Sequence, residues 1–131
     1  MQKKIVRTMT FSPYLEHTNP IFSRLKILKL VDIIKLKQGI TVYKYIKKNQ
    51  IQDNHNNLFT LTYIRQIHSY NTKTRARDDL YVPSVQTELG KSAPQYQLPK
   101  TWNEIPIVIR NTNNSKHFKT KFKDQLHTQY N

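Results

Sequence analysis

The sequence predicts a small, mainly helical domain with a possible short β-hairpin around residues 81–98. Apolar residues recur at intervals of three and four over much of the chain, which is the spacing of one face of an α-helix. Capping residues stand at the start of several of these segments. A length of 131 residues, of which 37 % are apolar, is enough for one ordinary domain. We therefore expect residues 1–131 to form a single domain or a domain fragment.

Two short helices are expected before residue 30. Residues 2–11 have Ile5 and Met9 four residues apart, which places both on one helical face. In the following segment, EHTNPIFSRLKIL, Asn19 is a suitable N-cap and Pro20 suits the first helical position. The residues predicted to share the inner face of this second helix are Phe22 and Leu25.

A longer helix is expected from Asp32, which is itself a suitable N-cap. Apolar residues follow at intervals of three and four, namely Ile33, Leu36, Ile40 and Tyr43. Ile34 and Val42 lie off this stripe, so the helix is expected to bury more than one side. The polar run at residues 49–57 has no apolar period and is predicted to be a loop.

The segment after residue 67 is predicted to contain a basic loop and then the possible hairpin. In HSYNTKTRARDD, cations alternate with small residues, as in an exposed loop: Lys73, Arg75 and Arg77. Residues 81–98 are rich in Tyr, Val and Thr, and Gly90 could form the turn of a hairpin. Pro83 and Pro94 restrict any strand there to an edge or a bulge.

The last helix is expected to begin at Ser115 as N-cap and to bury a stripe with a four-residue spacing: Phe118, Phe122 and Leu126. Lysines follow a neighbouring lane of the same helix: Lys116, Lys119 and Lys123. Before it, Trp102 lies between Pro99 and Pro106, and we expect its indole to be packed against the helices. The alternative is a base-stacking platform beside Lys100.

Charge is the strongest compositional feature of the chain. Lysine and arginine number 22 against 8 aspartate and glutamate, which gives a formal net charge of +14 and a pI near 10.1. Such an excess predicts a polyanionic partner, RNA or a nucleoprotein. The alternatives are a solvated surface that keeps the chain soluble, or a fragment whose acidic complement lies elsewhere in a larger protein.

Several classes of function are not supported by the composition. The absence of cysteine excludes disulfides, thiol catalysis and thiolate zinc sites. There is no signal-peptide core and no apolar run of membrane-spanning length, so we expect an intracellular chain, nuclear or cytoplasmic, without a membrane partner. Neither Gly39 nor Gly90 belongs to a phosphate-binding loop, and no cofactor, metal or small-molecule substrate is expected. The histidines lack zinc-site spacing: His17, His55, His68, His117 and His127.

Six segments follow one another in a specific order: HTNPIFSRLKILKLVDIIKL, HSYNTKTR, Tyr81 with Pro83, TELGKSAPQY, LPKTWNEIP and SKHFKTKFKDQL. Together they resemble the extreme C-terminal region of reverse transcriptases from non-LTR retrotransposons of the LINE type, jockey-like in kind. In that family the polymerase palm, with its metal-binding aspartates, lies upstream of this region. The resemblance therefore implies a non-catalytic tail of an RNA-directed DNA polymerase.

Two acidic sets could suggest catalysis, and both lack the required pattern. Two-metal nucleotidyl transfer needs carboxylates that converge on cations about 4 Å apart, whereas Asp78 and Asp79 follow Arg77 with no catalytic strand before them. We interpret them as solvated loop carboxylates paired with nearby arginines. A restriction-like nuclease needs Glu and Lys two residues apart on a strand, whereas Glu88 and Lys91 are three apart and would point away from each other. The chain is therefore not expected to be an enzyme.

Two functions follow as hypotheses. The first is a non-catalytic C-terminal part of a reverse transcriptase that contacts template RNA or the polymerase domain of a parent polyprotein. The second is a stand-alone basic RNA-binding or interaction protein derived from a transposable element. In both cases the expected nucleic-acid-binding residues are the cations of the loop and of the last helix: Lys73, Arg75, Arg77, Lys116, Lys119 and Lys123.

Overall fold

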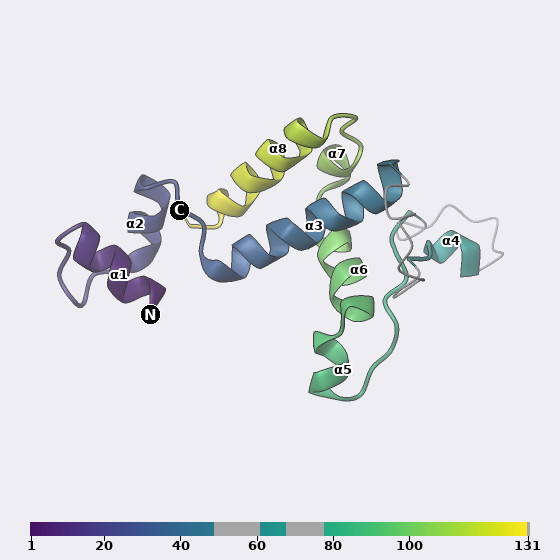
Figure 1. The fold of residues 1–131 in the computed structure, drawn as a ribbon, viewed down its shortest axis with the longest axis horizontal. Helices are drawn as coiled ribbons and strands as arrows, with labels where there is room; N and C mark the ends of the chain where they lie inside the picture. Colours follow the sequence, from purple (N-terminus) through teal and green to yellow (C-terminus); the bar gives the residue numbers. More distant parts are fainter. Residues whose placement is uncertain (49–60, 68–77, 131) are drawn as a thin grey trace.

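A computed structural model describes residues 1–48, 61–67 and 78–130, and these are mainly helical, as the sequence predicts (Figure 1). The helices in chain order are α1 (Gln2–Met9), α2 (Thr18–Arg24), α3 (Leu30–Lys48), α4 (Ile64–Ile67), α5 (Glu88–Ser92), α6 (Pro94–Glu104), α7 (Ile107–Arg110) and α8 (Ser115–Thr128). None of these described helices combines membrane-spanning length with sufficient apolar character. The predicted loop at residues 49–57 lies outside the described residues.

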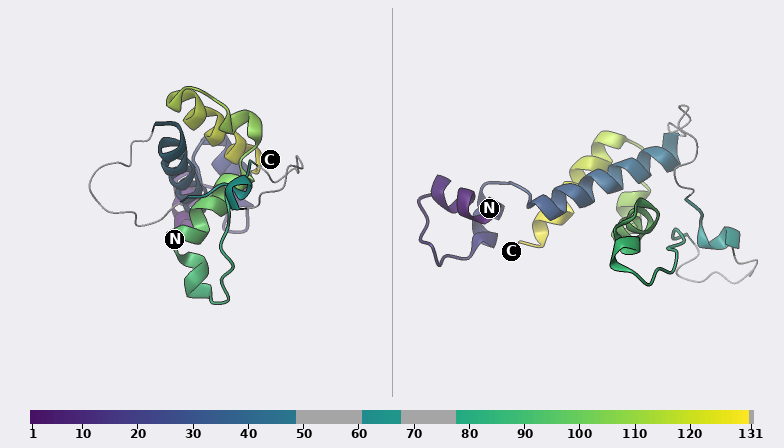
Figure 2. Two further views of the ribbon diagram at one scale, coloured as in Figure 1. Left: turned by 90° about the vertical axis from the view of Figure 1, so that its right-hand side faces the viewer. Right: turned by 60° about the horizontal axis from the view of Figure 1, so that its bottom comes forward.

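The centre of the molecule is formed by α3, α6 and α8. α8 lies alongside α3 in the opposite direction, while α6 crosses α3 (Figures 1 and 2). Phe118 of α8 stacks on Tyr43 of α3 with ring centroids 4.4 Å apart, and on Trp102 of α6 at 6.0 Å. The hydroxyl of Thr101 donates to Oε1 of Gln38 at 2.8 Å, which adds a polar link between α6 and α3. The N-terminal pair α1 and α2 lies at the beginning of α3.

The predicted inner faces of the two main helices are largely confirmed. Phe118, Phe122 and Leu126 are all buried on α8, at the four-residue spacing that predicted this helix. On α3 the buried apolar residues are Leu36, Val42 and Tyr43, and Val42 lies off the predicted stripe. Ile33 and Ile34 are 37 % and 50 % exposed, so the prediction that these two residues face the core is wrong. Trp102 is only 3 % exposed, which confirms that it is a packing residue and contradicts its alternative as a base-stacking platform.

Gly39 allows α3 to approach α6 and α8 closely. A β-carbon built on it would lie 2.5 Å from Cε1 of Phe122 and 3.1 Å from Cδ1 of Ile105. These side chains are 3 % and 1 % exposed respectively, so the surrounding core restrains their movement. The glycine is needed for space rather than for backbone conformation, because its φ is not positive.

Gly39→Ala is therefore expected to destabilise the fold, although alanine is the better helix former. Overpacking should cost about 1–3 kcal/mol, offset by up to about 1 kcal/mol of helix propensity. Urea denaturation would measure the difference in the free energy of unfolding. Thr41→Ala, an exposed position on the same helix, is the control and should be close to neutral. A Gly39→Ala variant more stable than the parent would contradict this account of the helix crossing.

The hairpin predicted around residues 81–98 is wrong. Among the described residues, sheet pairing is limited to an isolated antiparallel bridge between Tyr63 and Leu80. Residues 88–92 and 94–104 are instead the helices α5 and α6. Thr87 accepts a hydrogen bond from the backbone N–H of Gly90 at 3.0 Å and so caps α5, and Pro94 occupies the start of α6. Pro94, which suggested an edge strand, is thus a helix-starting residue, and Gly90, which suggested a turn, lies within α5.

Several helix starts and faces also differ from the prediction. On α1 the buried residue is Val6, while Ile5 and Met9 are 51 % and 64 % exposed. α2 begins at Thr18 rather than after Asn19, whose Oδ1 instead accepts from Nζ of Lys29 at 2.7 Å. The inner face of α2 consists of Ile21 and Phe22, whereas Leu25 is 36 % exposed.

The two other predicted N-caps are each displaced. α3 begins at Leu30, two residues before Asp32, and the N–H of Leu30 donates to Oε1 of Gln2 at 2.9 Å. α8 begins at Ser115, and its cap is Asn114, whose Oδ1 accepts from the N–H of Lys116 at 2.9 Å. The first displacement arises because a residue from a distant helix satisfies the backbone donor, which local sequence rules do not consider.

Candidate nucleic-acid interface

Three of the predicted cations form a lane along α8. Lys116 and Lys119 are exposed and Lys123 is half-buried, while the aromatic stripe of the helix faces the core. Their i, i+3, i+7 spacing covers about 10 Å of helix axis, at a rise of about 1.5 Å per residue. The stripe fixes the rotation of α8, so these charges are presented on a rigid element. We call these three residues the α8 lane.

The electrostatics at the start of α8 favour an anion. The first turn contains no acidic residue and does contain Lys116, beside the positive end of the helix dipole. A cation there is unfavourable by about 0.3–1 kcal/mol in the free chain. A phosphate close to this turn would relieve that repulsion and would meet the Lys116 ammonium.

A further cation, Lys26, lies near the other end of the lane and was not predicted. A hollow of about 290 Å³ lies between the end of α2 and the C-terminal part of α8, and it is lined by Lys26 and Lys123 together with the acidic residue Asp124. Lys26 has a left-handed backbone with φ 53. The N–H of Lys26 donates to the carbonyl of Ser23, and the N–H of Ile27 donates to the carbonyl of Phe22, both at 3.1 Å. These two hydrogen bonds form a Schellman C-cap at the end of α2. Helix periodicity cannot reveal Lys26, because its position depends on this cap and on the packing of α2 near α8.

The three predicted loop cations, Lys73, Arg75 and Arg77, lie outside the described residues, as do His55 and His68. The structure therefore neither joins them to the α8 lane nor separates them from it. The residue that follows this loop, Asp78, lines a hollow of about 210 Å³ together with Lys47 of α3 and Arg110 of α7. Asp78 is thus close to α7, which also packs against α8.

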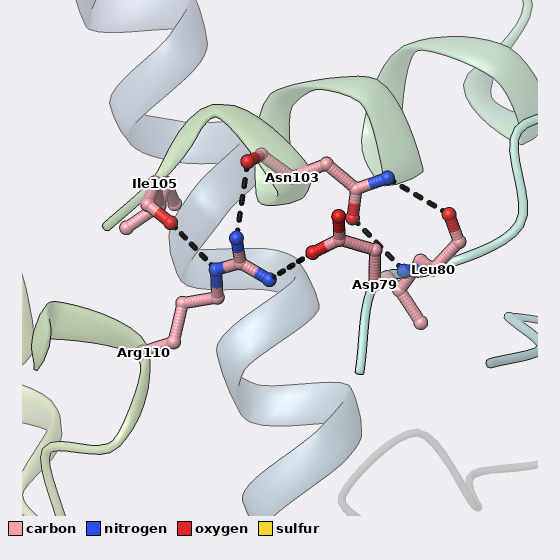
Figure 3. A network of polar contacts seen from close by, with 5 residues as sticks. All are labelled: Asp79, Leu80, Asn103, Ile105 and Arg110. Atoms are coloured by element: carbon pink, nitrogen blue, oxygen red, sulfur yellow. Dashed lines mark hydrogen bonds and ion pairs between the residues drawn. The ribbon is translucent and has the colours of Figure 1, made fainter. Parts of the chain in front are cut away.

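Asp79 is held in a polar network rather than solvated (Figure 3). Nη1 of Arg110 donates to Oδ1 of Asp79 at 2.7 Å, while its Nη2 and Nε donate to the carbonyls of Asn103 and Ile105 at 3.1 and 2.5 Å. The Asn103 amide also exchanges two hydrogen bonds with the backbone of Leu80, at 2.9 and 2.8 Å. The predicted pairing of Asp79 with an arginine is therefore confirmed, and this arginine belongs to α7. The network fixes residues 79 and 80 against α6 and α7.

The second acidic set also differs from its expected geometry. Glu88 and Lys91 lie on the helix α5, not on a strand, and residues three apart on a helix share one face. Nζ of Lys91 accordingly lies 2.6 Å from Oε1 of Glu88 in an exposed ion pair. Within the described ranges, no group of three or more His, Asp or Glu side chains is arranged to hold a metal ion.

Comparisons with protein-family models, curated proteins and solved structures found no match to this chain. The fold and the candidate site therefore define a class only: a small, basic, mainly helical protein that presents a lysine lane on a packed helix.

Proposed function

We propose that this chain is a non-catalytic nucleic-acid-binding segment that holds single-stranded RNA through its phosphate backbone. The observation that carries the proposal is the α8 lane, whose three lysines share one region of a helix fixed by a buried aromatic stripe. Backbone contacts of this kind give affinity with little sequence preference. Lys26 extends the cationic surface at the end of the lane, and the loop cations Lys73, Arg75 and Arg77 are proposed to add to it.

The resemblance to non-LTR reverse transcriptases supports a more specific form of this proposal. The chain would be the C-terminal part of an RNA-directed DNA polymerase. The bound RNA would be the template, and an upstream domain would catalyse DNA synthesis. It would contribute no catalytic carboxylates of its own. The ion pair of Asp79 with Arg110 agrees with this last expectation, since the carboxylate is already engaged.

A protein partner is the second candidate and is favoured by an exposed apolar region at the start of α3. Leu30, Val31 and Ile34 are 62 %, 64 % and 50 % exposed. Such side chains are compatible with contact to the polymerase domain of a parent polyprotein, or with another partner if the chain is a stand-alone protein derived from a transposable element. Co-purification of the chain with the matching upstream polymerase segment, lost in Val31→Asp, would support this candidate.

RNA binding should have a measurable salt dependence. If roughly four to six phosphates are engaged, the logarithm of the affinity should fall against the logarithm of the salt concentration with a slope of about −3 to −4, at about −0.7 per contact. Replacing Lys116, Lys119 and Lys123 by glutamine should make that slope less negative by about 2, because three phosphate contacts are lost. Replacing the loop cations Lys73, Arg75 and Arg77 should have a similar effect. Fluorescence anisotropy of a labelled single-stranded RNA would measure both.

A control with the same change of charge separates the lane from a general effect of net charge. Lys37, Lys44 and Lys100 are exposed and lie on α3 and α6, so their replacement by glutamine removes three charges outside the lane. This control should leave the slope nearly unchanged. Equal slopes for the lane variant and the parent chain, or no binding by the parent at about 50 mM salt, would overturn the proposal.

A further inference from the structure

A further hollow, of about 390 Å³, lies on the N-terminal part of the molecule, at the end of α1. Its lining combines two aromatic rings, two cations and two hydroxyls: Phe11, Tyr14, Lys4, Arg7, Thr8 and Ser12. Phe11 is 96 % exposed and Tyr14 is 81 % exposed. Two aromatic side chains that border a hollow and remain almost fully open to solvent do not stabilise the core, so a role in binding is the better explanation.

The position of Phe11 is fixed by an unfavourable backbone conformation. Its φ is 52, in the left-handed region where glycine is the usual residue. The N–H of Phe11 donates to the carbonyl of Thr8 at 3.3 Å, and the N–H of Ser12 donates to the carbonyl of Arg7 at 3.0 Å. These two hydrogen bonds form a Schellman cap at the end of α1. Phenylalanine at this position destabilises the cap relative to glycine and directs a large ring into solvent. Strain of this kind is common where a side chain serves a ligand.

Tyr14 and the turn that carries it are held by Arg7. Its guanidinium carbon lies 5.6 Å from the centroid of the Tyr14 ring. The same guanidinium donates from Nε and Nη2 to the carbonyl of Glu16, at 3.1 and 2.8 Å. Tyr14 is therefore positioned before any ligand arrives, which lowers the conformational entropy lost on binding.

We infer that this hollow binds an unpaired nucleobase of a single-stranded nucleic acid, which stacks on Phe11 and Tyr14 while Lys4 meets a neighbouring phosphate. Stacking on aromatic side chains beside cations is the general way in which proteins hold single strands without reading sequence.

Residues 1–15 contain Lys3, Lys4 and Arg7 and no acidic residue, so the surroundings of the hollow complement a polyanion. The hydroxyl-bearing residues Thr8 and Ser12 also line the hollow. The Thr8 hydroxyl donates to the carbonyl of Lys4 at 3.0 Å and the Ser12 hydroxyl pairs with that of Thr10 at 2.8 Å, and both oxygens can still accept a hydrogen bond. They suit the polar edge of a base better than the lipid interior that a membrane-inserting surface would meet. This inference rests on the proposed RNA binding and adds a base-stacking site to it.

Phe11→Gly is the most informative variant because it separates folding from binding. Glycine fits the left-handed cap without strain, so the melting temperature should not fall, whereas the affinity for a single-stranded RNA of about 12 nucleotides should decrease about 10-fold. The slope of affinity against salt should stay the same, since no phosphate contact is removed. Phe11→Trp should retain binding, because a stacking ring is retained. Met9→Ala, an exposed position on α1 that does not line this hollow, is the control and should bind like the parent.

The outcomes distinguish this site from the α8 lane. A parent chain that binds RNA with a lane-dependent slope while Phe11→Gly and Tyr14→Leu bind equally well would overturn the stacking site alone. No binding by the parent would overturn both. A third arm uses vesicles of phosphatidylserine and phosphatidylcholine. Sedimentation of the parent with these vesicles, lost in Phe11→Gly while RNA affinity is unchanged, would instead identify the hollow as a membrane-contacting surface.

Discussion

Trp102→Ala is expected to destabilise the protein by about 3–5 kcal/mol, the usual cost of removing a large buried aromatic side chain. The indole is 3 % exposed and stacks on Phe118, which in turn stacks on Tyr43, so the truncation opens a cavity where α6, α8 and α3 meet. A domain of this size commonly has a stability of about 5–15 kcal/mol, so the loss would remove a large part of it. Urea denaturation followed by circular dichroism would measure the change.

The parent protein offers an independent test, because Trp102 is the only tryptophan of the chain. Its emission should be blue-shifted and protected from iodide in the folded state, and should move to longer wavelength on unfolding. Trp102→Phe is the matched control: it keeps an aromatic ring against Phe118 and should cost less than the alanine variant. Emission like that of free tryptophan, with an unchanged denaturation curve for Trp102→Ala, would contradict the packing of α6 described above.

Local periodicity was sufficient to predict the helices whose buried faces are regular. The stripe Phe118, Phe122 and Leu126 predicted α8, and Leu36 with Tyr43 predicted the inner face of α3, because both helices bury a continuous face against neighbours. The same spacing failed on α1, where Ile5 and Met9 are exposed. A short helix that contacts the rest of the molecule on a narrow strip needs only one buried residue, here Val6, and periodicity cannot identify it.

Interactions between distant residues account for most of the remaining errors. The start of α3 depends on Gln2, whose amide accepts from Leu30 and donates to the carbonyl of Leu28 at 3.1 Å. Asp79 likewise finds its partner in Arg110, 31 residues later in the chain. These pairings are consequences of the fold, so local capping and charge rules could not have placed them. The candidate site shows the same division: the α8 lane follows from helical spacing, whereas Lys26 and the Phe11 hollow depend on left-handed caps at non-glycine residues.

Tyr130→Phe should have the second largest effect, because the phenol connects the C-terminal end of the chain with the start of α3. Its hydroxyl donates to Oδ2 of Asp32 and accepts from the N–H of Lys29 at 2.9 Å. Tyr130 and Asp32 are only 4 % and 7 % exposed. Removing the hydroxyl leaves a buried carboxylate and a backbone donor without this partner, which should cost about 2–4 kcal/mol at neutral pH.

The pH dependence of this difference gives a sharper test than its size. Burial, followed by the hydrogen bond to Asp32, raises the pKa of Tyr130 from 10.0 to about 12. Between these values the folded chain keeps the phenolic proton while the unfolded chain loses it. The stabilising effect is therefore complete below pH 10 and decreases as the pH rises toward 12, by about 1.4 kcal/mol per pH unit.

Urea denaturation at pH 8 to 11 should show the parent chain approaching Tyr130→Phe in stability. A constant difference across this range would show that the hydroxyl does not hold its proton more tightly in the folded chain.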